Sequence, residues 1–262
     1  MKNVLILGSG RSGTSMLTGI LADSGYHLGD RSDYLGINKA NPKGFFEDYE
    51  VNTINEDLIA LNIINIPENI RMRFFRSFTF YRARWLAQIP SFIKFKSNNA
   101  LDARIKDVVN NKPFCYKDPR FSYTLPVWDK FLNEDTVYLV IYREPWKTAE
   151  SIVRECNENP AIQEKLKMTY DSALNTWKCM YEFLLKTYNQ SNDKSRWMFI
   201  HYNQTFERET IQNIEELILV NVNADFAEKH ISRTKSSTRT ISRKIAHIYK
   251  SLNELANYNP EN

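Results

Sequence analysis

The sequence lacks any apolar stretch close to the roughly 20 residues that a membrane-spanning helix needs. Its start, Met1-Lys2-Asn3, leads into a short apolar run that ends at Gly8, which does not fit a secretory signal. We therefore expect a cytoplasmic protein with no membrane span.

Cysteine is also scarce. The three cysteines, Cys115, Cys156 and Cys179, are odd in number and have no metal-binding spacing. This excludes a disulfide framework and a zinc motif, so we expect reduced, packed thiols and no metal site.

Neither sign of charge dominates, and the sequence contains no internal repeat and no low-complexity linker. The formal net charge is +4, from 35 basic and 31 acidic residues. So small an excess favours an anionic ligand over a nucleic-acid partner. A length of 262 residues with 42% apolar residues fits one domain over 1–262.

The most informative stretch begins at the apolar run Val4–Leu7, which predicts a buried strand. A glycine-rich turn from Gly8 to Gly13 follows, and the spacing of Met16, Leu17, Ile20 and Leu21 then becomes helical. A strand, a glycine loop and a helix N-terminus present backbone N–H groups to an anion. A glycine turn without such a role, as in any α/β protein, is the alternative.

The loop differs from that of nucleotide hydrolases at one position. Gly8 and Gly13 have the spacing of G-x-x-x-x-G-K-[ST], but Thr14 replaces the lysine that reaches the β- and γ-phosphates. Arg11 is the only cation in the loop. We expect Arg11, Thr14 and Ser15 to bind a phosphate, and the transferred group to differ from a γ-phosphoryl.

Glu47 is a candidate general base. Asp48 can cap the helix predicted from Val51, but Glu47 has no such role, and it follows two aromatic residues that would bury it. A solvated loop carboxylate is the alternative interpretation.

Residues 66–100 mix arginines with aromatic residues. One interpretation is a helical subdomain with solvent-exposed arginines. The other is a lid that binds a sugar or an anionic acceptor, and a membrane-surface segment is a weaker third. The mixed residues are Arg71, Arg73, Phe74, Phe75, Arg76, Phe78, Phe80, Tyr81, Arg82, Arg84 and Trp85.

Three further strands are predicted at 113–117, 136–142 and 196–202. Asp118-Pro119 has the pattern of an N-cap and first helical residue, and longer helices are predicted at about 162–188 and 205–220. The alternation predicts an α/β fold of three layers, with a central, mainly parallel sheet flanked by helices. It also predicts a helical insertion at about 62–105 and a basic segment at about 229–262, whose stretch 229–250 is either a solvated face or a cover for a charged nucleotide.

Several cations occur where parallel strands end, which is where open α/β sheets bind ligands. Lys117 and Arg143 end two of the strands, and Ser151 lies on the following helix. With Arg11 in the loop, they form two separate anion sites. Two such sites without the loop lysine indicate a nucleotide with phosphates at its 5′ and 3′ positions.

At this point the sequence resembles the sulfotransferases that use 3′-phosphoadenosine 5′-phosphosulfate. Arg11–Ser15 resembles their 5′-phosphosulfate loop, and Arg143-x-Pro145-x5-Ser151 resembles their 3′-phosphate motif. Tyr116–Pro119 is similar to the segment with a catalytic lysine in the tyrosylprotein and carbohydrate branches. Asn41–Glu47 is similar to a segment common in bacterial members of this family. His201–Asn203 lies where the family has a tyrosine that contacts the nucleotide, which here is Tyr202.

The resemblance implies transfer of a sulfuryl group to an acceptor hydroxyl of a carbohydrate or other small polyol, without a metal. It implies catalytic roles for Glu47, Arg11 and Lys117. The expected donor-binding residues are Gly10, Arg11, Ser12, Gly13, Thr14, Ser15, Arg143, Ser151 and Tyr202.

One departure from the family concerns the base. Ser32 stands where the tyrosylprotein type has its acidic base, so His27 and Asp33 are rivals to Glu47. A small-molecule kinase with a degenerate loop, and a non-catalytic protein that binds adenosine 3′,5′-bisphosphate, are the alternative functions.

Overall fold

The computed structural model describes residues 1–29, 46–64, 66, 69, 82–164, 166–226 and 240–260. In these residues, four parallel strands form one sheet in the order β2-β1-β3-β4. The strands are β1 (Val4–Leu7), β2 (Cys115–Lys117), β3 (Val137–Tyr142) and β4 (Trp197–His201). The predicted α/β class and the parallel sheet are confirmed.

The sheet is buried on both faces, as its continuous apolar strands predict. Leu5 and Leu7 of β1 pack into one hydrophobic cluster, whereas Val4 and Ile6 pack into another on the opposite face. In register, Ile6 lies between Lys117 of β2 and Leu139 of β3. The strand that leads into the glycine loop is therefore internal to the sheet.

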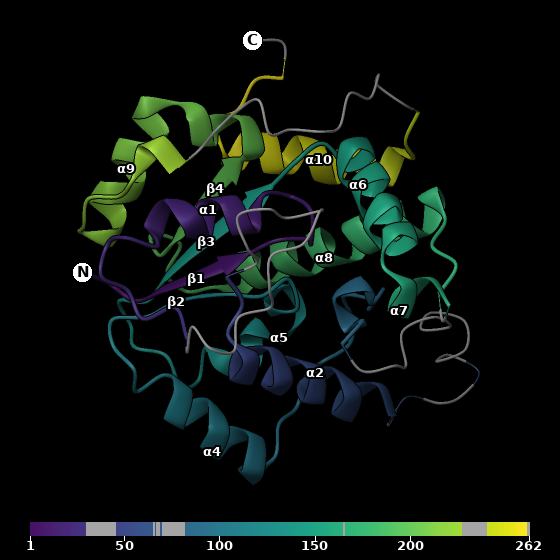
Figure 1. The fold of residues 1–262 in the computed structure, drawn as a ribbon, viewed down its shortest axis with the longest axis horizontal. Coiled ribbons are helices and arrows are strands. Elements are labelled where there is room, and N and C mark those ends of the chain that lie inside the picture. The colour runs from purple at the N-terminus through teal and green to yellow at the C-terminus, as the bar shows by residue number, and fades with distance from the viewer. Residues whose placement is uncertain are drawn as a thin grey trace.

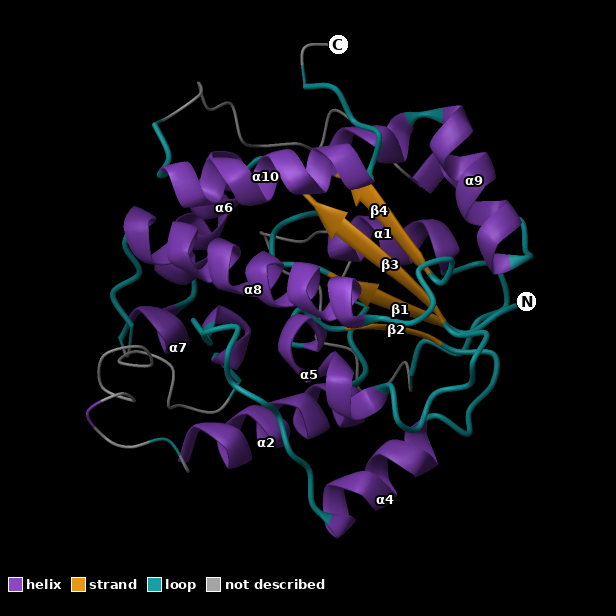
Figure 2. Cartoon of the chain, turned by 180° about the vertical axis from the view of Figure 1, so that it is seen from behind, coloured by secondary structure: helices purple, strands orange, loops and turns teal. Residues whose placement is uncertain are grey.

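Helices cover both faces (Figure 1). One face carries α1 (Thr14–Leu21) and α9 (Arg208–Ile218), and the other, seen in Figure 2, carries α5 (Phe121–Trp128), α8 (Tyr170–Gln190) and α10 (Arg243–Leu255). Further out lie α2 (Tyr49–Ile64), α4 (Asn99–Val108), α6 (Pro145–Glu158) and α7 (Pro160–Gln163). Short 3-10 helices are η2 (Arg84–Leu86), η3 (Tyr202–Phe206) and η4 (Ala224–Phe226). None of the helices in the described parts of the chain combines the length and hydrophobicity that crossing a membrane requires.

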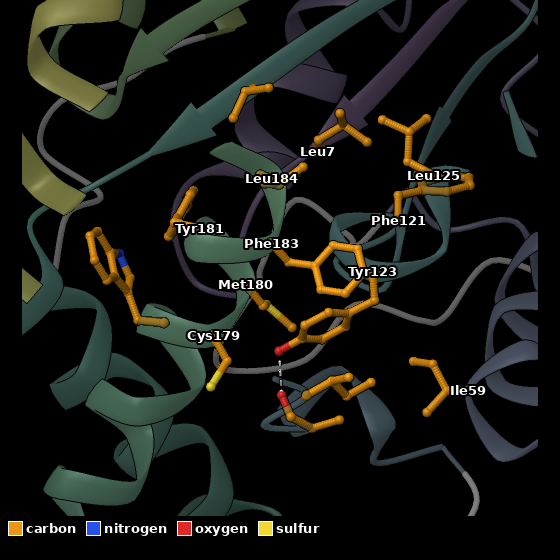
Figure 3. Packing of buried hydrophobic residues seen from close by; sticks show 14 of the residues in the cluster. Leu7, Ile59, Phe121, Tyr123, Leu125, Cys179, Met180, Tyr181, Phe183 and Leu184 are labelled. Carbon is orange, nitrogen blue, oxygen red and sulfur yellow. Dashed lines mark hydrogen bonds between the residues drawn. The ribbon is translucent and has the colours of Figure 1, made fainter. Parts of the chain in front are cut away.

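The larger hydrophobic cluster connects the chain after η2 to α5 and α8 (Figure 3). Tyr123 of α5 packs edge-on against Phe183 of α8, with ring centroids 5.5 Å apart. Its hydroxyl donates a hydrogen bond of 2.6 Å to the carbonyl of Ala87. A buried hydroxyl needs such a partner, so the residue that follows η2 is held against the core.

Two predicted helix starts are wrong. The helix predicted at 162–188 begins only at Tyr170, where Thr169 caps it by accepting a hydrogen bond of 3.2 Å from the Ser172 N–H. The helix predicted from Asp118-Pro119 begins at Phe121, and residues 118–120 form a turn in which the Asp118 carboxylate accepts hydrogen bonds from the Arg120 N–H and guanidinium. The predicted cap at Asp48 is confirmed by the 2.7 Å hydrogen bond from the Val51 N–H.

The predicted insertion at about 62–105 is described in part. It contains the end of α2, η2, an irregular stretch and the first residues of α4. The predicted Arg and aromatic residues from Arg71 to Tyr81 lie outside the described residues, as do residues 229–239 and 261–262 of the basic segment.

The three cysteines are reduced and buried, as predicted. Burial raises the pKa of each thiol, to about 12 at Cys156 and about 11 at Cys179. Packed thiols of this kind are not poised as nucleophiles.

Candidate active site

The carboxyl ends of the four strands meet at one edge of the sheet. The glycine loop follows β1, Lys117 ends β2, Arg143 follows β3 and Tyr202 follows β4. Ligands of open parallel sheets bind at this edge. The residues that sequence reasoning selected one by one therefore lie along a common edge.

The loop after β1 has a backbone that only glycine adopts easily at two positions. Gly8 has φ 140°, and a Cβ there would lie 2.2 Å from the Ile141 carbonyl oxygen. Gly13 has φ 100°, and a Cβ there would lie 2.6 Å from the Tyr202 ring. Both glycines let the loop lie directly on β3 and on the residue after β4.

A buried tyrosine that the sequence reasoning missed holds the same loop. The Tyr181 hydroxyl accepts a hydrogen bond of 3.1 Å from the Ser9 N–H and donates one of 2.8 Å to the Ile141 carbonyl. Ser12 is fully buried, with its hydroxyl 3.5 Å from that of Thr148 on α6. Gly13 precedes the first residue of α1, Thr14, so the loop ends at a helix N-terminus, the predicted anion-binding arrangement.

Glu47 and Lys117 form a buried ion pair next to this loop. The Lys117 ammonium donates a hydrogen bond of 2.6 Å to Glu47 Oε1, and Asn52 Nδ2 donates one of 3.0 Å to Oε2. Glu47 is 7% exposed and Lys117 is 2% exposed. Since burying two charges carries a large desolvation penalty, packing gains alone do not explain this pair. A carboxylate can accept a proton here, and the ammonium can stabilise negative charge.

Arg11 lies on the other side of the loop, toward α6. Its Nε donates a hydrogen bond of 3.2 Å to Ser151 Oγ, and its Nη1 lies 3.6 Å from Glu155 Oε2. The loop and the helix after β3 therefore share one polar cluster. Glu155, four residues after Ser151 on α6, was missed in the sequence, because one acid on an amphipathic helix carries no specific signal.

Arg143 and Tyr202 complete this side. The Arg143 guanidinium lies 4.4 Å from the Tyr202 ring centroid, and the Tyr202 ring edge contacts Gly13. Glu144, 3.7 Å from Arg143 Nε, also binds Lys147. Burial alone would raise the pKa of Glu144, but the hydrogen bond from Lys147 lowers it below its usual value.

A second buried charge cluster lies next to the Glu47–Lys117 pair. Glu56 of α2 is fully buried and accepts a hydrogen bond of 2.7 Å from Arg84 Nη1 and another of 2.7 Å from Arg120 Nε. Arg120 Nη1 in turn donates one of 2.9 Å to Asp118. Burial raises the pKa of Asp118 to about 6, against the opposing effect of the Arg120 guanidinium. These residues connect η2 to the end of β2.

Of the two other base candidates, only His27 lies among the described residues. His27 pairs through its backbone with Pro113 and Cys115, so it lies at the amino end of β2, away from Lys117. Ser32, Asp33 and Asn41–Phe45 lie outside the described residues. Among the described residues, no group of three or more His, Cys, Asp or Glu side chains could hold a metal ion.

Two supporting residues could have been found in the sequence. Asn52 and Glu56 are polar positions four residues apart within the apolar spacing Val51, Ile54 and Leu58 of α2. Polar groups on a buried helix stripe need partners, which here are Glu47 and two arginines. The partner of Asn52 lies five residues earlier, whereas the two arginines that bind Glu56 come from distant segments.

Comparison with known proteins gives a result only at the level of structure. No family model matches the sequence, and no curated protein matches it significantly. A solved sulfotransferase domain from the curacin biosynthetic pathway matches with a TM-score of 0.51 and 13% identity over 98% of each chain.

Two further solved structures match less closely. A sulfotransferase domain from the Synechococcus PCC 7002 olefin synthase has a TM-score of 0.47 and 13% identity, covering 96% of this chain and 95% of that one. A sulfotransferase from Alicyclobacillus acidocaldarius has a TM-score of 0.47 and 12% identity, covering 100% and 98%. The better match shows that this chain has, over nearly its whole length, the fold of a sulfotransferase domain.

Proposed function

We propose that this protein is a sulfotransferase that transfers a sulfuryl group from 3′-phosphoadenosine 5′-phosphosulfate to an acceptor hydroxyl. The observation that carries the proposal is the position of the glycine loop between two unlike groups. The buried Glu47–Lys117 pair lies toward β2, and the Arg143, Ser151 and Tyr202 cluster lies toward β3 and β4. One side suits proton transfer, and the other suits a nucleotide phosphate.

The donor is proposed to bind across the loop. Its 5′-phosphosulfate would contact the backbone N–H groups from Gly10 to Gly13 and the hydroxyls of Thr14 and Ser15 at the α1 N-terminus. Its 3′-phosphate would bind Arg143 and Ser151, and Tyr202 would contact the nucleoside. The missing loop lysine argues against a triphosphate as the donor.

In the proposed reaction, the acceptor oxygen attacks sulfur in line while the bond from sulfur to the bridging oxygen breaks. Glu47 takes the hydroxyl proton, and the products are the sulfate ester and adenosine 3′,5′-bisphosphate. Lys117, Arg11 and the loop N–H groups stabilise charge on the sulfuryl oxygens and the departing phosphate. These cations are proposed to supply the charge neutralisation that Mg²⁺ supplies in phosphoryl transfer, so no metal is invoked.

The acceptor is proposed to be a carbohydrate or another small polyol. Support comes from the Arg and aromatic residues of 71–85, because aromatic faces and bidentate guanidinium groups suit such molecules. The described end of this segment reaches the site, where Trp85 contacts Gly10.

Thermal melting tests the donor class. Adenosine 3′,5′-bisphosphate at ~100 times its Kd adds about 2.7 kcal/mol of stability, a shift of several degrees in a chain of this size. We expect this shift with the bisphosphate, and its loss in Arg143→Ala. Stabilisation by ATP with Mg²⁺ alone would contradict the proposal and favour a kinase. Bisphosphate binding without turnover on any hydroxyl would favour a non-catalytic binding protein.

A further inference from the structure

Trp85, in the centre of η2, lies directly on the glycine loop. A Cβ added at Gly10 would lie 2.7 Å from Trp85 Cε3 and 2.8 Å from Cζ3, closer than real Cβ contacts. The benzene half of the indole therefore occupies the space that any side chain at residue 10 would need. Trp85 itself is only half-buried, so the rest of the indole extends beyond this contact.

The indole lies on the Lys117 side of the loop. Pro119, two residues after Lys117, is also next to Gly10, with its Cγ 3.8 Å from the same Cβ position. Tyr202 contacts the loop at Gly13, on the side of Arg143. The loop thus lies between two aromatic rings, and Trp85 is the one next to the proposed acceptor side.

The turn that carries Trp85 is anchored by buried charges. Glu56 accepts hydrogen bonds from the Arg84 N–H at 3.2 Å and from Arg84 Nη1 at 2.7 Å, and it also binds Arg120. Two residues after Trp85, the Ala87 carbonyl accepts a hydrogen bond from the Tyr123 hydroxyl. These contacts, before and after Trp85 in the chain, fix η2 against α2 and α5. The position of the indole therefore does not depend on its contact with the loop alone.

We propose that Trp85 covers the acceptor side of the loop and excludes water from the sulfuryl group of the bound donor. This inference rests on the proposed function. The reaction it suppresses is hydrolysis, in which a water oxygen bonds to sulfur and the bond from sulfur to the bridging oxygen breaks. Hydrolysis releases sulfate, adenosine 3′,5′-bisphosphate and a proton. An apolar ring fixed over the reacting group removes the space and the hydrogen-bond partners that an attacking water needs.

The first test measures sulfate release from the donor in the absence of acceptor. We expect Trp85→Ala to raise the rate of donor hydrolysis about tenfold, equivalent to a barrier lower by about 1.4 kcal/mol. Trp85→Phe keeps an aromatic ring, so it should hydrolyse the donor at nearly the rate of the unmodified protein. Phe131→Ala is the matched control, because Phe131 is also a half-buried aromatic residue, and it precedes β3 at the opposite edge of the sheet.

The second test does not depend on the donor. Hydrogen–deuterium exchange of the amides from Gly8 to Gly13 should be faster in Trp85→Ala and unchanged in Phe131→Ala. An unchanged rate of donor hydrolysis in Trp85→Ala, with unchanged amide exchange and normal bisphosphate binding, would overturn the proposal that Trp85 excludes water. The proposed function would remain intact. Loss of bisphosphate binding in Trp85→Ala, but not in the unmodified protein or Phe131→Ala, would also overturn this proposal, because Trp85 would then be a residue that contacts the donor. Absence of bisphosphate binding in the unmodified protein would overturn the proposed function itself.

Discussion

At the scale of single residues, the proposed chemistry depends on whether Glu47 accepts a proton. Glu47→Gln keeps an oxygen acceptor for Lys117 but removes the basic carboxylate. We expect turnover to fall ~10²–10⁴-fold, the usual contribution of a general base, with bisphosphate binding retained. Steady-state kinetics at saturating donor and acceptor measure the change.

The control for this variant is Glu50→Gln. Glu50 lies three residues later and pairs with Arg104 on the protein surface, 2.7 Å from its Nε. Its removal should leave turnover unchanged. If Glu47→Gln retains near-normal turnover, the base is another residue, and Asp33 is the rival that the position of His27 at the amino end of β2 leaves.

Lys117 is expected to stabilise charge in the transition state. Lys117→Gln should lower turnover ~10²–10³-fold, as the loss of one oxyanion donor does in other enzymes. Lys112→Gln is the matched control, since Lys112 is exposed and hydrogen-bonded only to Asn133 among the contacts observed for its ammonium. A fall in donor affinity with unchanged turnover would assign Lys117 to binding instead.

His201 should make the fold sensitive to acid. Burial lowers the pKa of His201 to about 4, although Glu144 nearby opposes this change. Between pH 6.5 and 4 the unfolded chain binds the proton and the folded protein does not, so stability falls as the pH falls. The loss over this interval is about 3 kcal/mol.

The variant His201→Asn isolates this effect. Asparagine can still accept the hydrogen bond that the Asn203 N–H donates to His201 Nδ1 at 3.2 Å. Urea unfolding at pH 7 and pH 4.5 should show a smaller acid loss in the variant than in the unmodified protein. Equal losses in both proteins would mean that His201 does not cause the sensitivity.

At the scale of elements, Glu56 connects three segments: α2, η2 and the start of α5. Removing its charge leaves Arg84 and Arg120 close together without their shared carboxylate. We expect Glu56→Gln to lower the free energy of unfolding by about 3–5 kcal/mol, as breaking a buried ion pair does. Urea unfolding of Glu50→Gln, which breaks an exposed pair, should show a loss of at most about 1 kcal/mol.

If Glu56→Gln unfolds like Glu50→Gln, the cluster does not anchor η2. A double-mutant cycle with Arg84→Met then separates the two halves of the cluster. Coupling between Glu56 and Arg84 would be seen as non-additive losses.

Strands were easier to predict than helix starts. The four strands are continuous runs of β-favouring residues, and a parallel sheet buried on both faces requires such runs. The start of α8 and the role of Asp118 depend on partners that the local pattern does not specify. Asp118 has the residue type of an N-cap, but a buried guanidinium two residues later competes for its carboxylate.

At the scale of the whole molecule, the parallel topology explains why the site could be predicted in outline. Once four strands run in parallel, the residues after each of them share an edge, so Lys117, Arg143 and Tyr202 come together without further information. The contacts of Trp85 and Glu56 could not be predicted this way. These contacts join segments outside the sheet, and the order of the strands does not specify which of those segments are neighbours.

The central claim is that this edge binds a nucleotide with a separate 3′-phosphate at Arg143. The most direct test is isothermal titration calorimetry, which gives the Kd of adenosine 3′,5′-bisphosphate and of adenosine 5′-monophosphate for the unmodified protein and for Arg143→Ala. Arg196→Ala is the control, because Arg196 precedes β4 at the opposite edge and binds the Thr136 carbonyl. We expect loss of the 3′-phosphate to weaken binding about 10–100-fold in the unmodified protein, the range for a charge-assisted hydrogen bond, and far less in Arg143→Ala. An equal weakening in both proteins would contradict the assignment of the 3′-phosphate to Arg143, and equal affinity of the unmodified protein for the two nucleotides would contradict the proposed donor.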